Sequence, residues 1–197
     1  MPVSSGPTRR GAARRAELLD GLIEVMLREG FAGLSLDDLA ARLQCSKSTL
    51  YAVAASKEQL IAAAVREFFR RATERVEARA AAEPDATERI RAYLDAIAAE
   101  LAPATPTFLA DVDAFAPTRE IYDRNTSAAA ARVADLVAAA ARPGRPVDAA
   151  FVGAVAAAVM PAIQHGRLGW GAPHDHAAAY SALADLILAG LVGAPRR

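Results

Sequence analysis

The chain has 197 residues, of which 53% are hydrophobic and 23% charged, so it can bury a core and is not a disordered chain. A single cysteine excludes a disulfide framework, and the basic amino terminus lacks the apolar run of a secretory signal, so we expect a cytoplasmic protein. The formal net charge is zero, but residues 1–71 hold 11 basic and 8 acidic residues, whereas residues 72–197 hold 12 and 15. Such segregation is typical of a nucleic-acid-binding surface attached to a neutral domain.

Apolar residues at helical spacing, interrupted by glycine and proline, predict helices along the chain. In chain order these helices cover residues 12–28, 36–43, 47–53, 57–80, 86–101, 107–115, 118–141, 147–166 and 175–192. Ser35 and Ser46 are placed as N-caps of the second and third helices, and Gly30 as the end of the first. No segment shows the sustained alternation of a strand, so we predict an all-α fold.

Residues 149–166 form the longest uncharged run, close to the minimum length of about 17 residues for a membrane span. The run contains Pro161, Gln164 and His165. We therefore favour a helix buried on two sides and expect no membrane partner.

The short helices at 36–43 and 47–53, joined by a tight turn, describe a helix-turn-helix unit. In such a unit the second helix enters the major groove of DNA while the first braces across the backbone. Lys47, Ser48, Thr49 and Tyr51 supply hydrogen-bond donors on that second helix, and Leu50 is its inward anchor.

The segment LSLDDLAARLQCSKSTLYAVAASKEQL resembles the DNA-binding domain of the TetR family of bacterial transcriptional regulators. The matching elements are Phe31, residues 35–40, Ser46-Lys47, Thr49-Leu50-Tyr51, Ser56-Lys57-Glu58 and Leu60. The resemblance covers residues 12–62, about a quarter of the chain. It implies a helix-turn-helix domain at 12–56, a connecting helix at 57–82, and a ligand-binding and dimerisation domain at 83–197. The Pro, Gly, Ser and Arg residues before them predict a flexible basic arm at 1–11.

The resemblance also implies which residues contact DNA. They are Ser35, Lys47, Ser48, Thr49, Tyr51, Ala52 and Lys57. Lys47 and Ser48 occupy positions that read base edges, whereas Thr49, Tyr51 and Lys57 occupy positions that contact phosphates.

Two departures from the family pattern stand out. Val53 and Ala54 replace a phosphate-contacting histidine and an aromatic packing residue. Gln44 stands where the family carries glycine in a left-handed turn, and there a side chain costs about 1 kcal/mol. Neither departure removes the residues that read DNA.

The carboxy-terminal helices carry more apolar surface than one core needs, because the helix from Val147 is apolar on two sides. We expect this helix and the last one to pack across a two-fold axis and form a homodimer. The predicted interface residues are Phe151, Val155, Val159, Leu183, Leu186 and Ile187. The alternative is a monomer in which both apolar stripes are buried internally.

Family resemblance implies an effector pocket in the second domain, and its lining can be predicted from bulky or polar residues within apolar helices. The candidates are Tyr93, Phe108, Phe115, Tyr122, Met160, His165 and Trp170. Because alanine and valine dominate these helices, we expect a hydrophobic or aromatic small molecule.

Other chemistry finds little support in the sequence. His174, Asp175 and His176 follow Pro173 and are better interpreted as capping residues than as metal ligands. Enzyme motifs such as a nucleophile elbow or a phosphate-binding glycine loop do not occur. We therefore expect no catalysis, metal or cofactor.

The resemblance predicts a sequence-specific DNA-binding transcriptional regulator, a repressor released by a small-molecule effector. An alternative is an all-α small-molecule-binding protein or enzyme whose amino-terminal domain is vestigial. Another is a protein-interaction module. Neither alternative would have a specific DNA site.

Overall fold

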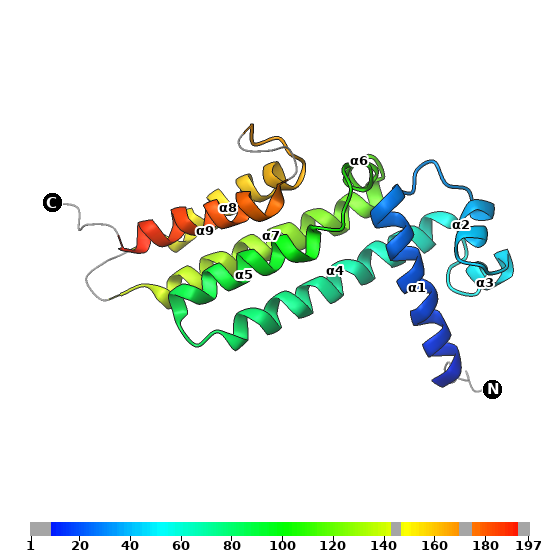
Figure 1. Ribbon diagram of the computed structural model, residues 1–197, viewed down its shortest axis with the longest axis horizontal. Coiled ribbons are helices and arrows are strands. Elements are labelled where there is room, and N and C mark those ends of the chain that lie inside the picture. Colours follow the sequence, from blue (N-terminus) through cyan, green and yellow to red (C-terminus); the bar gives the residue numbers. More distant parts are fainter. Residues whose placement is uncertain (1–8, 143–146, 170–174, 193–197) are drawn as a thin grey trace, which may run out of the picture.

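The computed structural model describes residues 9–142, 147–169 and 175–192, and every regular element in these ranges is an α-helix (Figure 1). The helices are α1 (Arg9–Glu29), α2 (Leu36–Arg42), α3 (Lys47–Tyr51), α4 (Lys57–Ala82), α5 (Ala86–Leu101), α6 (Pro106–Ala114), α7 (Ala116–Ala140), α8 (Ala149–Gln164) and α9 (His176–Val192). Each was predicted from the sequence, with boundaries that differ by at most three residues. The all-α prediction is therefore confirmed.

Short polar side chains cap the amino-terminal ends of several of these helices. The hydroxyl oxygens of Ser35, Ser46 and Ser56 each accept a hydrogen bond from the backbone N–H three residues further on. Ser35 and Asp38 cap each other reciprocally at the start of α2. Since such a cap stabilises a helix by about 1 kcal/mol, these serines fix where the short helices α2 and α3 start.

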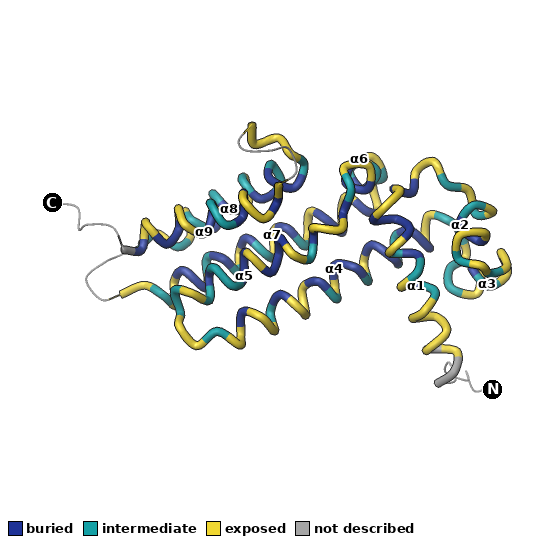
Figure 2. Tube along the Cα trace, in the orientation of Figure 1, coloured by how far each residue is buried: buried dark blue, intermediate teal, exposed yellow. Residues whose placement is uncertain are grey.

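Helix α4 links the two parts of the molecule. Its first turns lie beside α2 and α3, and its remainder runs along the pair formed by α5 and α7 (Figure 1). Helices α8 and α9 cover the other side of that pair, where α8 packs on α7 and α9 on α5. Figure 2 shows buried residues between these layers and exposed residues on their outer sides.

The hydrophobic core is continuous between the helix-turn-helix unit and the bundle. Edge-to-face aromatic contacts mark the junction, with the Phe31 ring 6.2 Å from Phe108 and 6.5 Å from Phe115 between centroids. Phe68 of α4 lies 6.1 Å from the same Phe108 ring. Because Phe31 follows α1 and Phe108 belongs to α6, these packed rings connect α6 to the DNA-binding end.

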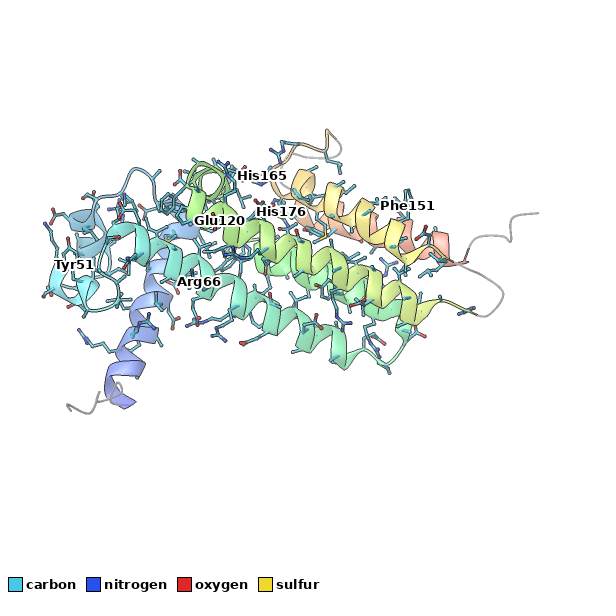
Figure 3. All side chains as sticks on the ribbon, turned by 180° about the vertical axis from the view of Figure 1, so that it is seen from behind. Tyr51, Arg66, Glu120, Phe151, His165 and His176 are labelled. Carbon is cyan, nitrogen blue, oxygen red and sulfur yellow. The ribbon has the colours of Figure 1, made fainter. Side chains whose placement is uncertain are left out.

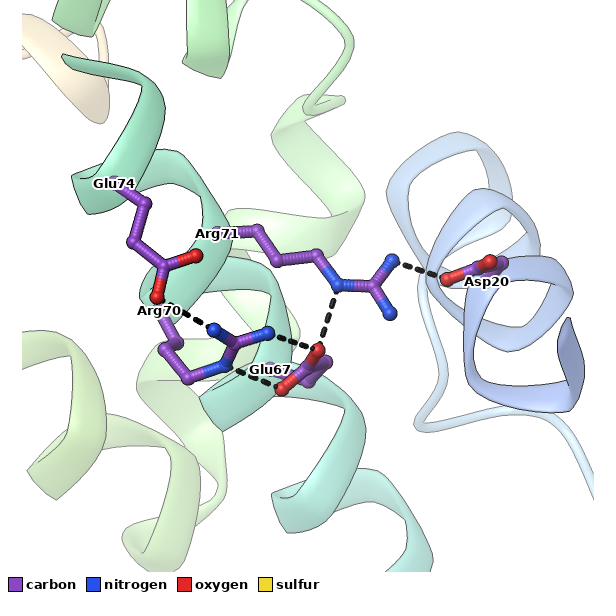
Figure 4. A network of polar contacts seen from close by, with 5 residues as sticks. All are labelled: Asp20, Glu67, Arg70, Arg71 and Glu74. Atoms are coloured by element: carbon purple, nitrogen blue, oxygen red, sulfur yellow. Dashed lines mark hydrogen bonds and ion pairs between the residues drawn. The ribbon is translucent and has the colours of Figure 1, made fainter. Parts of the chain in front are cut away.

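A network of ion pairs also connects α1 to α4 (Figure 4). The Arg71 guanidinium pairs with Asp20 of α1 and, at 2.6 Å, with Glu67 of its own helix. Arg70 binds the same Glu67 carboxylate at 2.6 Å and that of Glu74 at 2.6 Å. Glu67 thus holds both arginines and orients the one that reaches across to α1.

Two glycines allow close approach of neighbouring segments. Gly30 has φ +76°, and a Cβ there would lie 2.5 Å from a carboxylate oxygen of Asp111. A Cβ at Gly153 of α8 would lie 2.8 Å from the Cβ of Ala134 on α7. Gly30 therefore serves as the predicted end of α1, and Gly153 lets α8 lie directly against α7.

Within the described ranges, no helix is both long enough and apolar enough to cross a membrane. Helix α8, which contains most of the uncharged run, is 16 residues long and includes Pro161.

Candidate nucleic-acid interface and effector cavity

Helix α3 presents an exposed polar face at one end of the molecule, where Figure 3 labels Tyr51. Lys47, Ser48 and Ala52 are exposed, and Tyr51 has an exposed fraction of 51%. Leu50, by contrast, is 1% exposed and anchors the helix in the core. The helix is thus held from beneath while its outer side chains remain available to DNA.

The hydroxyl groups at the start of α3 are organised by its N-cap. The Ser46 hydroxyl oxygen lies 2.7 Å from that of Ser48 and 2.9 Å from that of Thr49. It also accepts a hydrogen bond from the Thr49 backbone N–H at 3.2 Å. These side chains therefore have defined positions before any DNA is bound.

Lys47 forms an ion pair with Asp37 of α2, with 2.6 Å between Nζ and Oδ1. The hydrogen bond from Lys47 to this carboxylate raises the pKa of the lysine, so its amine stays charged. Both side chains are more than half exposed, which lets a DNA phosphate or base replace Asp37 as the partner of Lys47. Sequence reasoning missed this pair, because it joins two helices across the turn.

The starts of α2 and α4 carry the remaining predicted DNA contacts. The Ser35 hydroxyl donates to the Asp38 carboxylate at 2.6 Å and, together with the Ser35 backbone N–H, lowers the pKa of Asp38. The Lys57 amine donates to the carbonyl oxygen of Ala32 at 3.4 Å. Ser35 is exposed and Lys57 half-buried, so both can reach a backbone phosphate with only local rearrangement.

The turn between α2 and α3 has the conformation expected from the sequence. Gln44 has φ +49° and is the one non-glycine residue with positive φ among those described. Val53 and Ala54, which replace the family's histidine and aromatic residue, pack against the core and offer no polar group. Cys45 is a partly buried free thiol beside this turn.

A cavity of about 380 Å³ lies between α4, α5, α7 and α8, within the usual size range for small-molecule sites. Its apolar wall includes Phe69, Val76, Ile97, Leu101 and Met160. The lining also includes charged side chains that sequence reasoning did not select. Charged residues on amphipathic helices are ordinarily solvent-exposed, so nothing in the sequence indicates that these residues line a cavity.

Several polar and charged side chains line this cavity. The Glu77 carboxylate and the Arg132 guanidinium form a two-oxygen ion pair at 3.0–3.2 Å. Glu100 pairs with Arg75 at 2.5 Å. Tyr93 is only 4% exposed, and burial raises the pKa of its hydroxyl, which therefore stays neutral.

Gln164 connects the cavity to the loop that follows α8. Its side-chain carbonyl accepts a hydrogen bond from the Tyr122 hydroxyl, and its amide donates to the Tyr180 hydroxyl at 2.7 Å. The Tyr122 ring lies 5.5 Å from that of His165, whose Nδ1 is 3.4 Å from the Asp113 carboxylate of α6. Gln164 therefore connects the cavity lining to side chains that lead to α6.

Residues 18–64 match the family model for bacterial regulatory proteins of the tetR family. The matched segment contains the second half of α1, all of α2 and α3, and the beginning of α4, and so it includes the exposed face of α3. The chain is a TetR-family transcriptional regulator. Members of this family bind DNA and are not enzymes, which favours a regulator over the two alternative interpretations of the sequence.

Solved structures share the fold over nearly the whole length of this TetR-family chain. A TetR-like regulator from Rhodococcus sp. RHA1 is 21% identical with a TM-score of 0.61, covering 93% of this chain and 98% of that one. A TetR-family regulator from Streptomyces coelicolor is 19% identical, with a TM-score of 0.63 and coverage of 92% and 93%. A protein from Saccharomonospora viridis in complex with choline is 19% identical, with a TM-score of 0.66 and coverage of 89% and 96%. The search of curated proteins finds no match.

Only two of the predicted pocket residues, Tyr93 and Met160, line the cavity of this regulator. Phe108 and Phe115 instead pack around Phe31 at the junction with the DNA-binding end. Tyr122 and His165 lie behind the cavity and reach it through Gln164, and Trp170 falls outside the described residues. The sequence shows which positions carry aromatic side chains. Whether such a side chain points into the cavity depends on how the helices pack.

The predicted dimer residues divide between two environments. Phe151 and Leu186 have exposed fractions of 66% and 67%, and Figure 3 shows Phe151 on the outer side of α8. Val155 and Val159 are half-buried on the same helix. Leu183 and Ile187, at 5% and 8% exposed, point into the core because α9 packs against α5. Leu183 and Ile187 therefore do not belong to the exposed outer face of α8 and α9.

Among the described residues, no group of three or more His, Cys, Asp or Glu side chains could hold a metal ion. His174 lies outside that part of the chain.

Proposed function

We propose that this TetR-family regulator is a homodimeric repressor that binds a near-palindromic operator through α3 and is released by a small molecule bound in the cavity. The exposed Lys47–Tyr51 helix, anchored by a buried Leu50, is the observation that carries the operator-binding proposal. Base edges would be read by Lys47 and Ser48. Thr49, Tyr51 and Lys57 would contact phosphates, with Ser35 and Ala52 at the edges of the contact area.

The proposed dimer rests on the outer face of α8 and α9. Phe151 and Leu186 expose large apolar side chains on adjacent helices, and small alanines between them permit close packing. Two such faces related by a two-fold axis would form a four-helix interface. A symmetric dimer would then present two α3 helices to half-sites in successive major grooves.

Release by an effector is supported by the connection between the cavity and the DNA-binding end. Phe69 lines the cavity on α4, the helix that begins at Lys57, and Gln164 leads through Tyr122 to α6. An effector that binds one orientation of these helices more tightly would increase the fraction of the regulator in that orientation. The separation of the two α3 helices would change as a result.

The cavity's apolar wall supports an effector with a hydrophobic portion. The choline complex of the Saccharomonospora viridis protein, which shares the fold, illustrates a small molecule bound by such an architecture. Because the family consists of bacterial regulators that act on DNA, we place this protein in the cytoplasm.

Selection from a random double-stranded DNA pool at low and physiological salt tests operator binding directly. We expect a two-fold symmetric site whose binding survives physiological salt and is lost in Tyr51→Ala. Leu168→Ala, an exposed residue far from α3, is the control and should select the same site. Binding without sequence preference that disappears as salt rises would reflect phosphate attraction alone and would contradict the proposal.

A further inference from the structure

We propose that the effector cavity accepts an amphipathic organic cation, a molecule with one protonated amine and an apolar body. This inference rests on the proposed function for the cavity's role, but the binding chemistry is argued from the cavity itself. The apolar wall formed by Phe69, Val76, Ile97, Leu101 and Met160 provides space for the body. The polar part of the lining determines the head group.

Acidic groups outnumber basic groups in that polar part. Glu77, Glu100 and Asp135 line the cavity, whereas Arg132 is the one basic side chain among its described lining residues. Arg75 neutralises Glu100 from outside the cavity, and Arg132 neutralises Glu77 from within it. Asp135 forms no hydrogen bond or ion pair with a described residue, although its charge acts on that of Arg132. The three acids at the cavity therefore exceed Arg132 and Arg75 by one charge.

Ion-paired carboxylates can still accept further hydrogen bonds. Glu77 accepts from Arg132 at both oxygens, but a carboxylate has about four acceptor positions. An ammonium group can therefore bind Glu77 without displacing Arg132. An anionic head would instead face an excess of negative charge and would have to separate the Glu77–Arg132 pair.

The hydroxyl of Tyr93 is the second observation that points to a ligand. Tyr93 lines the cavity, and the exposed fraction of its surface is only 4%. No described residue forms a hydrogen bond with its hydroxyl. Every fully buried side-chain oxygen or nitrogen in the described part of the chain has a hydrogen-bond partner. Because the Tyr93 hydroxyl has none, it is not fully buried and opens on the cavity. Its neutral oxygen can accept a hydrogen bond from an ammonium N–H.

Binding of three ligands that each contain eight carbons but differ in the head group tests the proposal. Octylamine is positively charged at neutral pH, octanoate is negatively charged and octanol is neutral. Isothermal titration calorimetry with the full-length protein should show that octylamine binds most tightly. Tighter or equal binding of octanoate or octanol, or binding of none of the three, would overturn the proposal.

Variants of the lining residues separate the head-group site from general hydrophobic binding. Tyr93→Phe should weaken octylamine binding about tenfold, the effect of one lost hydrogen bond, and should leave octanol binding unchanged. Glu77→Gln and Asp135→Asn should also weaken octylamine selectively. Asp135 is exposed, so its variant remains informative if Glu77→Gln does not fold. Asp123→Asn, an exposed acid on the same helix α7 outside the cavity, is the matched control and should change nothing.

Operator binding measured in the same samples distinguishes failure of this inference from failure of the proposed function. Octylamine that binds and lowers operator affinity supports both. Octylamine that binds without changing operator affinity supports the cation site and contradicts its role as the effector site. Unchanged octylamine affinity in Tyr93→Phe, Glu77→Gln and Asp135→Asn would overturn the cation site, whether or not the protein binds an operator.

Discussion

The carboxylate of Asp111, on α6, accepts hydrogen bonds from the backbone N–H groups of Phe31 at 2.5 Å and Ala32 at 2.9 Å. Gly30 makes this contact possible, because any side chain there would collide with the carboxylate. A second link lies close by, where the Thr105 N–H donates to the carbonyl oxygen of Leu27 at 3.0 Å. Helix α6 is thus attached to the segment that follows α1 by hydrogen bonds as well as by packed phenylalanine rings.

The first prediction is that Asp111→Ala loosens the attachment between α6 and the DNA-binding end. We expect the free energy of unfolding to fall by about 2 kcal/mol, because hydrogen bonds to a charged acceptor are lost. Hydrogen exchange at the Phe31 and Ala32 amides should become faster. Asp123→Ala removes an exposed carboxylate on α7 and is the control. Unchanged exchange at these two amides would show that Asp111 does not hold them in solution.

The second prediction concerns pH and the ion-pair network at Glu67. The hydrogen bonds from Arg70 and then Arg71 lower the pKa of Glu67 from 4.5 to about 2. A carboxyl group with a lowered folded-state pKa stabilises the fold fully above its unfolded-state value, and this contribution disappears as pH falls from about 4.5 to about 2. Glu67→Gln should therefore destabilise the protein by about 1 kcal/mol at neutral pH and by progressively less in acid.

Urea unfolding of the wild-type protein and of Glu67→Gln, from neutral pH down to about pH 2, measures the difference in their free energies of unfolding. Glu74→Gln is the matched control, because Glu74 binds only Arg70 and its side chain is 63% exposed. We expect the control to have a smaller effect. A Glu67→Gln destabilisation that stays constant from neutral pH into acid would contradict the linkage.

Local sequence signals explain why the helices were predictable. Ser35, Ser46 and Gly30 act on neighbouring backbone groups, so their effects can be inferred from adjacent residues alone. The resemblance to a known family likewise depends on a contiguous segment, which the family match at residues 18–64 confirms.

Contacts between distant segments explain what the sequence could not predict. Asp111 and Phe31 are 80 residues apart, and nothing in either local sequence indicates that they meet. Glu77 and Arg132 are 55 residues apart and are ordinary charged residues in their own helices. Their position in the cavity lining follows only from how α4 and α7 pack against each other.

The third prediction concerns strain in the turn before α3. Gln44 has φ +49°, a region that disfavours side chains, whereas glycine enters it freely. Gln44→Gly should raise the free energy of unfolding by about 0.5 kcal/mol, because relief of strain exceeds the greater entropy of glycine in the unfolded chain. Gln44→Ala retains a Cβ and is the control for loss of the amide. Equal effects of the two substitutions in thermal unfolding would argue against strain at this position.

The fourth prediction is that Asp37→Asn strengthens operator binding. The Asp37 carboxylate holds the Lys47 amine at 2.6 Å and must give up that contact when the lysine reaches DNA. Its removal should increase affinity severalfold and, because one negative charge beside the DNA is lost, make binding more sensitive to salt. Fluorescence anisotropy over a range of salt concentrations measures both quantities. Asp123→Asn changes the net charge equally on α7, so an identical gain in that control would point to overall charge.

The fifth prediction tests the outer face of α8 and α9. Phe151→Asp and Leu186→Asp each place a charge where the proposed homodimer buries a large apolar side chain, and two-fold symmetry repeats each change. Losing the burial of one such side chain weakens association by about 2 kcal/mol, so both variants should shift towards monomer. Their helix content should not change, because both side chains point away from the protomer core.

Sedimentation velocity measures this change in mass, and Leu168→Asp is the control because it alters an exposed leucine outside both helices. A monomer presents one α3 helix to one half-site, so the monomeric variants should also lose most of their operator affinity, although α3 itself is unchanged. Retention of the wild-type mass by both variants would place the dimer interface elsewhere. Retention of operator affinity by a monomeric variant would mean that a single α3 helix is sufficient for recognition.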